Sequence, residues 1–254
     1  MADRVKGKKS LIYGGGTGIG LACTEALARE GSAVFVSGRR EGVLADATAR
    51  LAPTGVAGFA AGDATSVADV QRVTAAAAHF MGGIDTIVIS AGAGGPTSIF
   101  DTDVDEFQRI IDNNLRPVFL AVRHGIAHLL AAGQGSVIVI SSMYGLVGQR
   151  ERVAYCGAKA GVNGMVRSMA LDLAGNGIRV NAICPGFVET QLALDVASRE
   201  ADPEASLRSK RLMHPIARAG RLTEMGELAV YLASDLSAFT TGQAIAVDGG
   251  YTAR

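Results

Sequence analysis

The sequence predicts a single α/β domain, in which a parallel β-sheet carries helices on both faces. Short runs rich in β-branched residues alternate with longer amphipathic stretches, an order typical of parallel strands joined by right-handed helical crossovers. The runs IVIS and SVIVIS are apolar almost throughout, as expected of strands that are covered on both sides. A length of 254 residues fits one large domain or two small ones, and no Pro/Gly/Ser-rich linker divides the chain.

The same alternation places the individual elements. We expect strands at residues 10–13, 33–37, 56–60, 86–90, 136–141, 179–183 and 244–247. We expect helices at residues 18–30, 41–51, 67–80, 105–130, 153–174 and 223–233. Residues 188–214 interrupt the alternation, because they are charged, contain a proline and have only weak helical periodicity. This segment is longer than a crossover needs, so it is either a lid or binding loop, or a surface excursion without a role.

Composition excludes several classes of protein. Lys plus Arg and Asp plus Glu number 24 each, which argues against a general surface for nucleic acid or anionic membranes. The three cysteines are odd in number and lack metal-ligand spacing, so we expect free thiols in a reducing compartment and no metal site. No apolar run reaches the ~18 residues of a membrane span, and the apolar stretch near the start is too short for a signal peptide. These features predict a soluble, cytoplasmic protein.

A glycine-rich turn follows the first expected strand and opens the first expected helix. Glycine allows a tight turn and a close approach to a pyrophosphate, while the helix N-terminus offers free N–H groups to its oxygens. A tight loop without a ligand is the weaker alternative in this position. The turn predicts a dinucleotide site formed by Gly14, Gly16, Thr17, Gly18, Ile19 and Gly20.

The end of the second expected strand indicates which dinucleotide is bound. An acid commonly stands here to bind the ribose 2′-OH of NAD, but this chain has Gly38 followed by Arg39 and Arg40. Glycine leaves room for a 2′-phosphate and a guanidinium can clamp it, so the pattern favours NADP(H) over NAD(H). The alternative is that both arginines are solvated surface charges.

Two later strand ends complete the expected cofactor site. Asp63, next to Ala64, follows the third strand, where its carboxylate is either an acceptor for the adenine amine or a helix N-cap. Ala91 and Gly92 follow the fourth strand, where small side chains let a ribose lie against the backbone.

Ser142, Tyr155 and Lys159 are the candidate catalytic residues. Ser142 ends the fifth expected strand, and ligands of an open α/β sheet bind at the carboxyl ends of its strands. Tyr155 and Lys159 are four residues apart and therefore share a helix face. An ammonium near a phenol lowers the phenol pKa from its usual ~10, which prepares a general acid/base.

Six motifs in this order resemble the short-chain dehydrogenase/reductase family over essentially the whole chain. They are GGGTGIG at 14–20, NLR at 114–116, ISS at 140–142, YCGAK at 155–159, RVNAICPG at 179–186 and GQAIAVDGGYT at 242–252. The resemblance implies a Rossmann-type, doubly wound sheet of about seven parallel strands. It also implies hydride transfer between NAD(P)H and a carbonyl or secondary alcohol of a small substrate.

Roles follow from the resemblance, position by position. Tyr155 is the general acid/base, Lys159 binds the nicotinamide ribose and tunes the tyrosine, Ser142 positions the carbonyl, and Asn114 holds a water of a proton relay. The nicotinamide end contacts Pro185, Gly186, Val188 and Thr190. Residues 188–214 match the family's variable substrate loop. A NAD-linked alcohol dehydrogenase and a non-catalytic dinucleotide-binding regulator are the alternatives.

The substrate is the least constrained part of the expectation. Candidate pocket residues are Met143, Phe187 and Leu192, with Gly94, Gly95, Tyr144 and Val147 nearby. Arg152 lies in the stretch that faces substrate in the family, so it is either a ligand for an anionic substrate group, or an arginine that faces solvent or pairs with Glu151. Family members are usually tetramers or dimers, which implies a homo-oligomer.

Two positions depart from the family pattern. Tyr13 stands where the first strand usually ends in Thr, and Ile89 stands where the fourth usually carries Asn. Ile89 cannot make the hydrogen bonds of that asparagine. We therefore expect altered geometry near the cofactor but intact catalytic residues.

Overall fold

One sheet of seven parallel strands forms the centre of the protein in a computed structural model that describes residues 3–51 and 55–253. The strands are β1 Lys9–Tyr13, β2 Ala33–Gly38, β3 Ala57–Ala61, β4 Thr86–Ile89, β5 Gly135–Ile140, β6 Ile178–Pro185 and β7 Ala244–Val247. Their order is β3-β2-β1-β4-β5-β6-β7, so the chain reverses direction across the sheet after β3. This is the expected Rossmann-type fold in a single domain.

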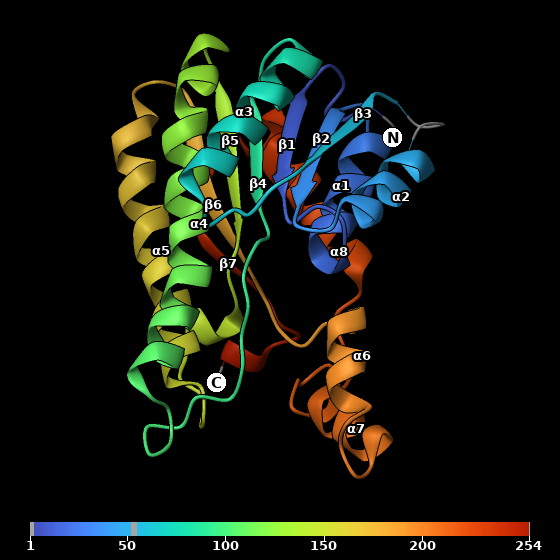
Figure 1. The fold of residues 1–254 in the computed structure, drawn as a ribbon, viewed down its shortest axis with the longest axis vertical. Coiled ribbons are helices and arrows are strands. Elements are labelled where there is room, and N and C mark those ends of the chain that lie inside the picture. Colours follow the sequence, from blue (N-terminus) through green and yellow to red (C-terminus); the bar gives the residue numbers. More distant parts are fainter. Residues whose placement is uncertain (1–2, 52–54, 254) are drawn as a thin grey trace.

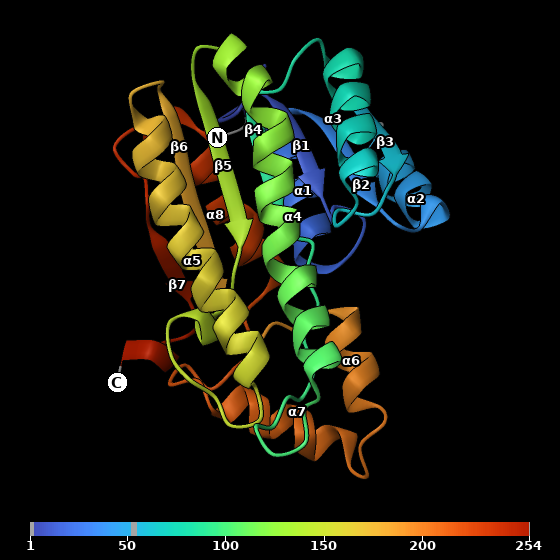
Figure 2. The same cartoon turned by 60° about the vertical axis from the view of Figure 1, so that its left-hand side comes forward.

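Helices cover both faces of the sheet. They are α1 Gly18–Arg29, α2 Glu41–Leu51, α3 Val67–Met81, α4 Val104–Ala131, α5 Val153–Ala174, α6 Gln191–Ala197, α7 Pro203–Leu212 and α8 Leu222–Ala233. Helices α3, α4 and α5 pack on one face over one apolar core, and α1, α2 and α8 pack on the other face over a second (Figures 1 and 2). No helix of the described ranges is long and apolar enough to cross a membrane.

The segment 188–214 is more regular than its sequence predicts, because it contains α6 and α7. Each helix has a side-chain cap: the Thr190 hydroxyl accepts from Ala193 N, and the Asp202 carboxylate accepts from Ala205 N. Pro203 occupies the first turn of α7, where a proline is well tolerated. Both helices lie beyond the carboxyl ends of the strands, while α8 forms the crossover to β7 (Figure 1).

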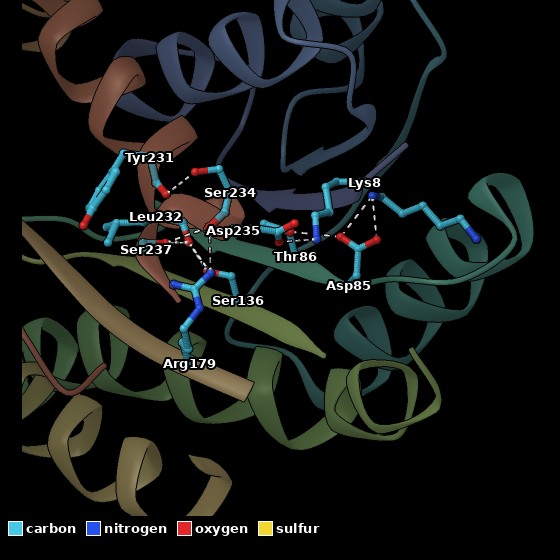
Figure 3. A network of polar contacts seen from close by, with 11 residues as sticks. Lys8, Asp85, Thr86, Ser136, Arg179, Tyr231, Leu232, Ser234, Asp235 and Ser237 are labelled. Carbon is cyan, nitrogen blue, oxygen red and sulfur yellow. Dashed lines mark hydrogen bonds and ion pairs between the residues drawn. The ribbon is translucent and has the colours of Figure 1, made fainter. Parts of the chain in front are cut away.

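The amino edge of the sheet is fixed by polar contacts (Figure 3). The Arg179 guanidinium donates to the carbonyl oxygens of Leu232 and Ser234, at the end of α8, and the Ser136 hydroxyl also donates to Leu232 O. A cation there also balances the partial negative charge of a helix C-terminus. This edge therefore anchors α8, and it leaves the opposite, carboxyl edge for ligands.

Candidate active site

The glycine-rich turn after β1 has the shape of a pyrophosphate cradle. Gly14 has a positive φ of 78°, and a side chain on Gly20 would place Cβ 2.1 Å from Gly14 O. Thr17 precedes α1 in extended conformation and makes no side-chain cap, so the first-turn N–H groups have no side-chain partner there. Such N–H groups, with the positive end of the helix, suit an anionic phosphate. The chain thus fits the dinucleotide predicted from its sequence.

The end of β2 has space beside two exposed arginines. A Cβ on Gly38 would meet only Leu44, at 3.5 Å. Arg39 and Arg40 are exposed, and neither forms an ion pair with another described residue. The predicted phosphate ligands are therefore available at the strand end, as the NADP prediction requires.

Asp63 shapes the next strand end without capping a helix. Its Oδ1 accepts from the Thr65 N–H and hydroxyl, both at 2.8 Å, while Ser66 is the N-cap of α3. The N-cap alternative for Asp63 is therefore wrong. Ala64 packs against the apolar core, so only its backbone can face a cofactor.

Ser142, Tyr155 and Lys159 come together beside the end of β5. The Ser142 hydroxyl accepts from Tyr144 N at 3.2 Å, and Tyr155 lies in the first turn of α5. Lys159 is only 5% exposed; its Nζ donates to Ile140 O at 3.0 Å and lies 5.6 Å from the centre of the Tyr155 ring. The predicted spacing thus produces a compact cluster.

Burial controls the ionisation of this cluster. It lowers the pKa of Lys159 to about 8. It also raises the pKa of Tyr155, and the nearby Ser142 hydroxyl and Arg152 charge offset this only in part. The predicted lowering by Lys159 is therefore wrong for this structure, because desolvation dominates and the ammonium is directed at Ile140 O. The phenol is held in its protonated form, which is the form that donates a proton.

Asn114 brings an unused acceptor to the same place. Its Nδ2 donates to Ala93 O at 2.7 Å and Ile110 O at 2.8 Å, but its buried Oδ1 has no hydrogen bond among the described residues. A Cβ on Gly92 would lie 2.8 Å from this Oδ1 and 3.4 Å from Lys159 Nζ. Buried acceptors are normally satisfied, so this oxygen fits a bound ligand or water. Ala91 directly precedes Gly92 and is therefore next to this site.

The loop after β6 lies opposite the glycine turn. Pro185 ends β6, and Gly186 N donates to the end of β7. Val188 is buried, and a Cβ on Gly18 would lie 3.4 Å from Thr190 Cγ2. One predicted phosphate residue, Gly18, therefore lies beside one predicted nicotinamide residue, Thr190, and Ile19 follows Gly18 in the first turn of α1.

His214 fixes this loop, although no sequence motif points to it. The histidine is 2% exposed; it accepts from Phe187 N at Nε2 (3.1 Å) and donates from Nδ1 to Asp248 O (2.6 Å). Its ring also packs on Tyr251, 5.7 Å between centres. A single histidine within a charged segment has no recognisable pattern, so only the tertiary structure reveals this link.

The predicted substrate residues differ in their exposure. Phe187 and Arg152 are half-buried, and Leu192 on α6 is 68% exposed. Met143 is only 3% exposed and contributes to the interior rather than to a binding surface. Arg152 bonds weakly to the carbonyl of Glu151, at 3.4 Å, so the predicted pairing with the Glu151 carboxylate is wrong.

The two departures from the family pattern are accommodated in the core. Tyr13 and Ile89 pair across β1 and β4 and are fully buried on the α3–α5 face. The Tyr13 hydroxyl bonds to Thr74 Oγ1 at 2.7 Å. Neither side chain enters the crevice.

Comparisons with known proteins agree with this geometry. A family model described as Enoyl-(Acyl carrier protein) reductase matches residues 14–252. The 2-(S)-hydroxypropyl-CoM dehydrogenase 3 of Xanthobacter autotrophicus (strain ATCC BAA-1158 / Py2) is 38% identical over 100% of both chains. The NADP-dependent (R)-specific alcohol dehydrogenase of Lentilactobacillus kefiri is 35% identical, again over 100% of both.

A solved structure supports the same assignment. A tryptophan-substituted variant of actinorhodin polyketide ketoreductase with NADPH superposes with a TM-score of 0.92 at 31% identity, covering 99% of each chain. Family members bind a nicotinamide dinucleotide and a small molecule. The chain belongs to the short-chain dehydrogenase/reductase family and is an oxidoreductase of alcohol and ketone substrates.

Proposed function

We propose that the protein is an NADP(H)-dependent oxidoreductase that interconverts a ketone and a secondary alcohol, with Tyr155 as general acid/base. The observation that carries the proposal is the cluster of Ser142, Tyr155, Lys159 and Asn114 at the carboxyl edge, opposite a phosphate cradle. A bound nicotinamide dinucleotide supplies or accepts the hydride.

The chain's own residues manage the proton and the oxygen. In reduction, the protonated phenol of Tyr155 donates to the carbonyl oxygen as charge develops there. The Ser142 hydroxyl donates a hydrogen bond to the same oxygen and holds it in place. The phenol regains its proton from the side of the Lys159 ammonium, and the free acceptor Oδ1 of Asn114 would hold a water that links Lys159 to solvent. Oxidation follows the same path in reverse.

The preference for NADP(H) rests on Gly38, Arg39 and Arg40. The strand end lacks the acid that would repel a 2′-phosphate, and its arginines are unpaired among the described residues. One relative is named NADP-dependent and one similar structure is named with NADPH. A NAD-linked alcohol dehydrogenase is the alternative.

Fluorescence titration of NADPH and NADH tests the cofactor. We expect tighter binding of NADPH, and Arg39→Ala should remove most of that preference while Arg50→Ala, an exposed arginine on α2, leaves it intact. Equal affinities in the unaltered protein would overturn the NADP proposal. A non-catalytic regulator is the second alternative, and turnover of a ketone panel that Tyr155→Phe abolishes would exclude it.

We also propose the roles of the surrounding parts. Residues 188–214 act as the substrate lid, with Phe187, Leu192 and Arg152 on the substrate side. The Arg211 guanidinium bonds Glu189 at 2.6 Å and Glu204 at 2.8 Å, so it ties α7 to the loop before α6. Met143 supports this pocket from within the core.

Assembly as a homotetramer or homodimer is proposed through α4 and α5. Phe119 and Leu171 are exposed on these adjacent helices, and a Cβ on Gly164 would meet nothing (Figure 2). Gly161, by contrast, packs on Leu115 within the subunit. A reducing, cytoplasmic location is consistent with free Cys23, Cys156 and Cys184.

A further inference from the structure

The start of α5 carries a guanidinium that no carboxylate of the described residues neutralises. Arg152 is half-buried at the start of α5, three residues before Tyr155, and forms no ion pair with any described residue. Arg152 is the N-cap residue of α5, whose first turn carries Tyr155, and its positive charge favours the ionised form of the nearby Tyr155 phenol. A partly desolvated cation without a partner is costly unless something anionic binds it.

The backbone is built to hold Arg152 in this position. Glu151 adopts a positive φ of 55°, a conformation that non-glycine residues rarely adopt. Thr97 brackets the position, since its N–H donates to Glu151 O at 2.8 Å and its carbonyl accepts from Val153 N at 3.0 Å. Backbone strain of this kind persists where the surroundings enforce it and gathers at functional sites. Here it fixes the backbone on both sides of Arg152 at the start of α5.

A second unpaired cation stands on the lid. Lys210 on α7 is half-buried, and its Nζ lies 5.9 Å from the centre of the Phe187 ring. Its neighbour Arg211 is engaged by two carboxylates, whereas Lys210 forms no ion pair with the described residues. Phe187 is linked through His214 and Tyr251 to the loop of Tyr144. These contacts therefore connect Lys210 on α7 to the loop that begins at Tyr144 and ends at Arg152.

Apolar side chains are also exposed on α6 and on the loop that follows β5. Leu192 and Val196 on α6 are exposed, and so is Leu146 near the end of β5. Exposed apolar side chains on the same two chain segments as Arg152 and Lys210 suit a ligand that has a hydrocarbon body and an anionic end.

We propose that the substrate is a ketone or secondary alcohol that carries an anionic group on an apolar body, and that Arg152 binds this group, with Lys210 as a second positive charge. The inference rests on the proposed function and names the substrate class of that same site. A guanidinium binds a carboxylate through two parallel hydrogen bonds, which fixes the reacting carbonyl relative to Tyr155.

The test compares 5-oxohexanoate with its methyl ester, which keeps the ketone and removes the charge. The ratio of kcat/KM for the acid to that for the ester isolates the anion contact, because any effect of Arg152 on the Tyr155 phenol changes both substrates alike. Variants are Arg152→Gln and Lys210→Gln. Matched controls are Arg150→Gln and Arg208→Gln, which each remove an exposed positive charge nearby.

We expect the unaltered enzyme to prefer the acid at least about tenfold, Arg152→Gln to lose about tenfold or more of that ratio, and both controls to retain it. Lys210→Gln should reduce the ratio by a smaller factor. Turnover of the ester as fast as the acid, or a ratio that Arg152→Gln leaves unchanged, would overturn the anion proposal while leaving the oxidoreductase proposal intact.

Calorimetric titration of 5-oxohexanoate separates the two proposals if neither probe is reduced. If 5-oxohexanoate binds to the unaltered protein and Arg152→Gln abolishes this binding, the proposed anion site stands and the proposed reaction is rejected. Absence of both turnover and binding would reject both.

Discussion

Replacing Lys159 by methionine should stabilise the cofactor-free protein while abolishing its activity. The buried ammonium has its pKa lowered from 10.5 to about 8. A shift of this size corresponds to a cost of about 3 kcal/mol at neutral pH, since each pKa unit is ~1.4 kcal/mol. Methionine has a similar shape and no charge, but it leaves the Ile140 carbonyl without its hydrogen bond, which costs about 1 kcal/mol.

The net gain should be about 2 kcal/mol in the free energy of unfolding at pH 7, or a rise in Tm of ~4–8 °C for a chain of this size. The sign depends on pH in a defined way. Between the folded pKa of about 8 and the unfolded value of 10.5 the unfolded state binds more protons, so the native protein gains stability as pH rises. The advantage of Lys159→Met should therefore be constant below pH 8, and above about pH 10.5 the variant should be the less stable protein by about 1 kcal/mol, because only the lost hydrogen bond remains.

Urea unfolding of the two proteins from pH 7 to pH 10.5, followed by circular dichroism, measures this difference. Lys6→Met is the control, because Lys6 is exposed on the surface and its removal should change stability by less than about 0.5 kcal/mol. The argument from burial would be refuted if Lys159→Met were less stable than the unaltered protein at pH 7. It would also be refuted if the difference in free energy of unfolding were the same at pH 7 and at pH 10.5.

Three further outcomes follow from other contacts. Gly20→Ala should abolish NADPH binding in a fluorescence titration and lower the Tm, because its Cβ would clash with the backbone oxygen of the turn's first glycine; unchanged affinity would contradict the cradle. Tyr13→Phe should cost about 1 kcal/mol in urea unfolding by removing the bond to Thr74, with kcat unaltered. The Arg4 guanidinium lowers the pKa of Glu30 to about 2, so this pair stabilises the fold above about pH 4.5 and the benefit is lost as pH falls toward 2. In acid unfolding, Glu30→Gln should not show this loss of stability between pH 4.5 and 2. If the variant and the unaltered protein lose stability equally over this range, the stabilising role of the Arg4–Glu30 pair is contradicted.

The regular part of the fold was predictable because its pattern is local. Alternation of apolar strands and amphipathic helices located all seven strands, with the end of β6 two residues later than expected. The helices α6 and α7 were missed, since their charged residues obscure the periodicity. Asp202 followed by Pro203 is nevertheless a helix-start pattern, and it could have located α7.

The sequence predicted which residues come together in the candidate active site, but it did not predict their electrostatics. Motif order brought Ser142, Tyr155 and Lys159 to one place, because strand ends meet at one edge. The direction of the Tyr155 pKa shift depends on burial, and the spacing of two residues carries no information on burial. His214 depends on contacts with Phe187 and Asp248, which are 27 and 34 residues away, so it required the tertiary structure.

Stabilising contacts and candidate catalytic groups lie at opposite edges of the sheet, and this separation affects where the chain can accept substitutions. Contacts of Arg179 and Ser136 secure one edge, while the groups proposed for catalysis lie at the other. Substitutions that raise thermal or solvent stability can therefore be introduced at the amino edge, away from the groups proposed for catalysis. An engineer could reshape α6 and α7 for a new substrate and compensate the lost stability at the far end of the same strands.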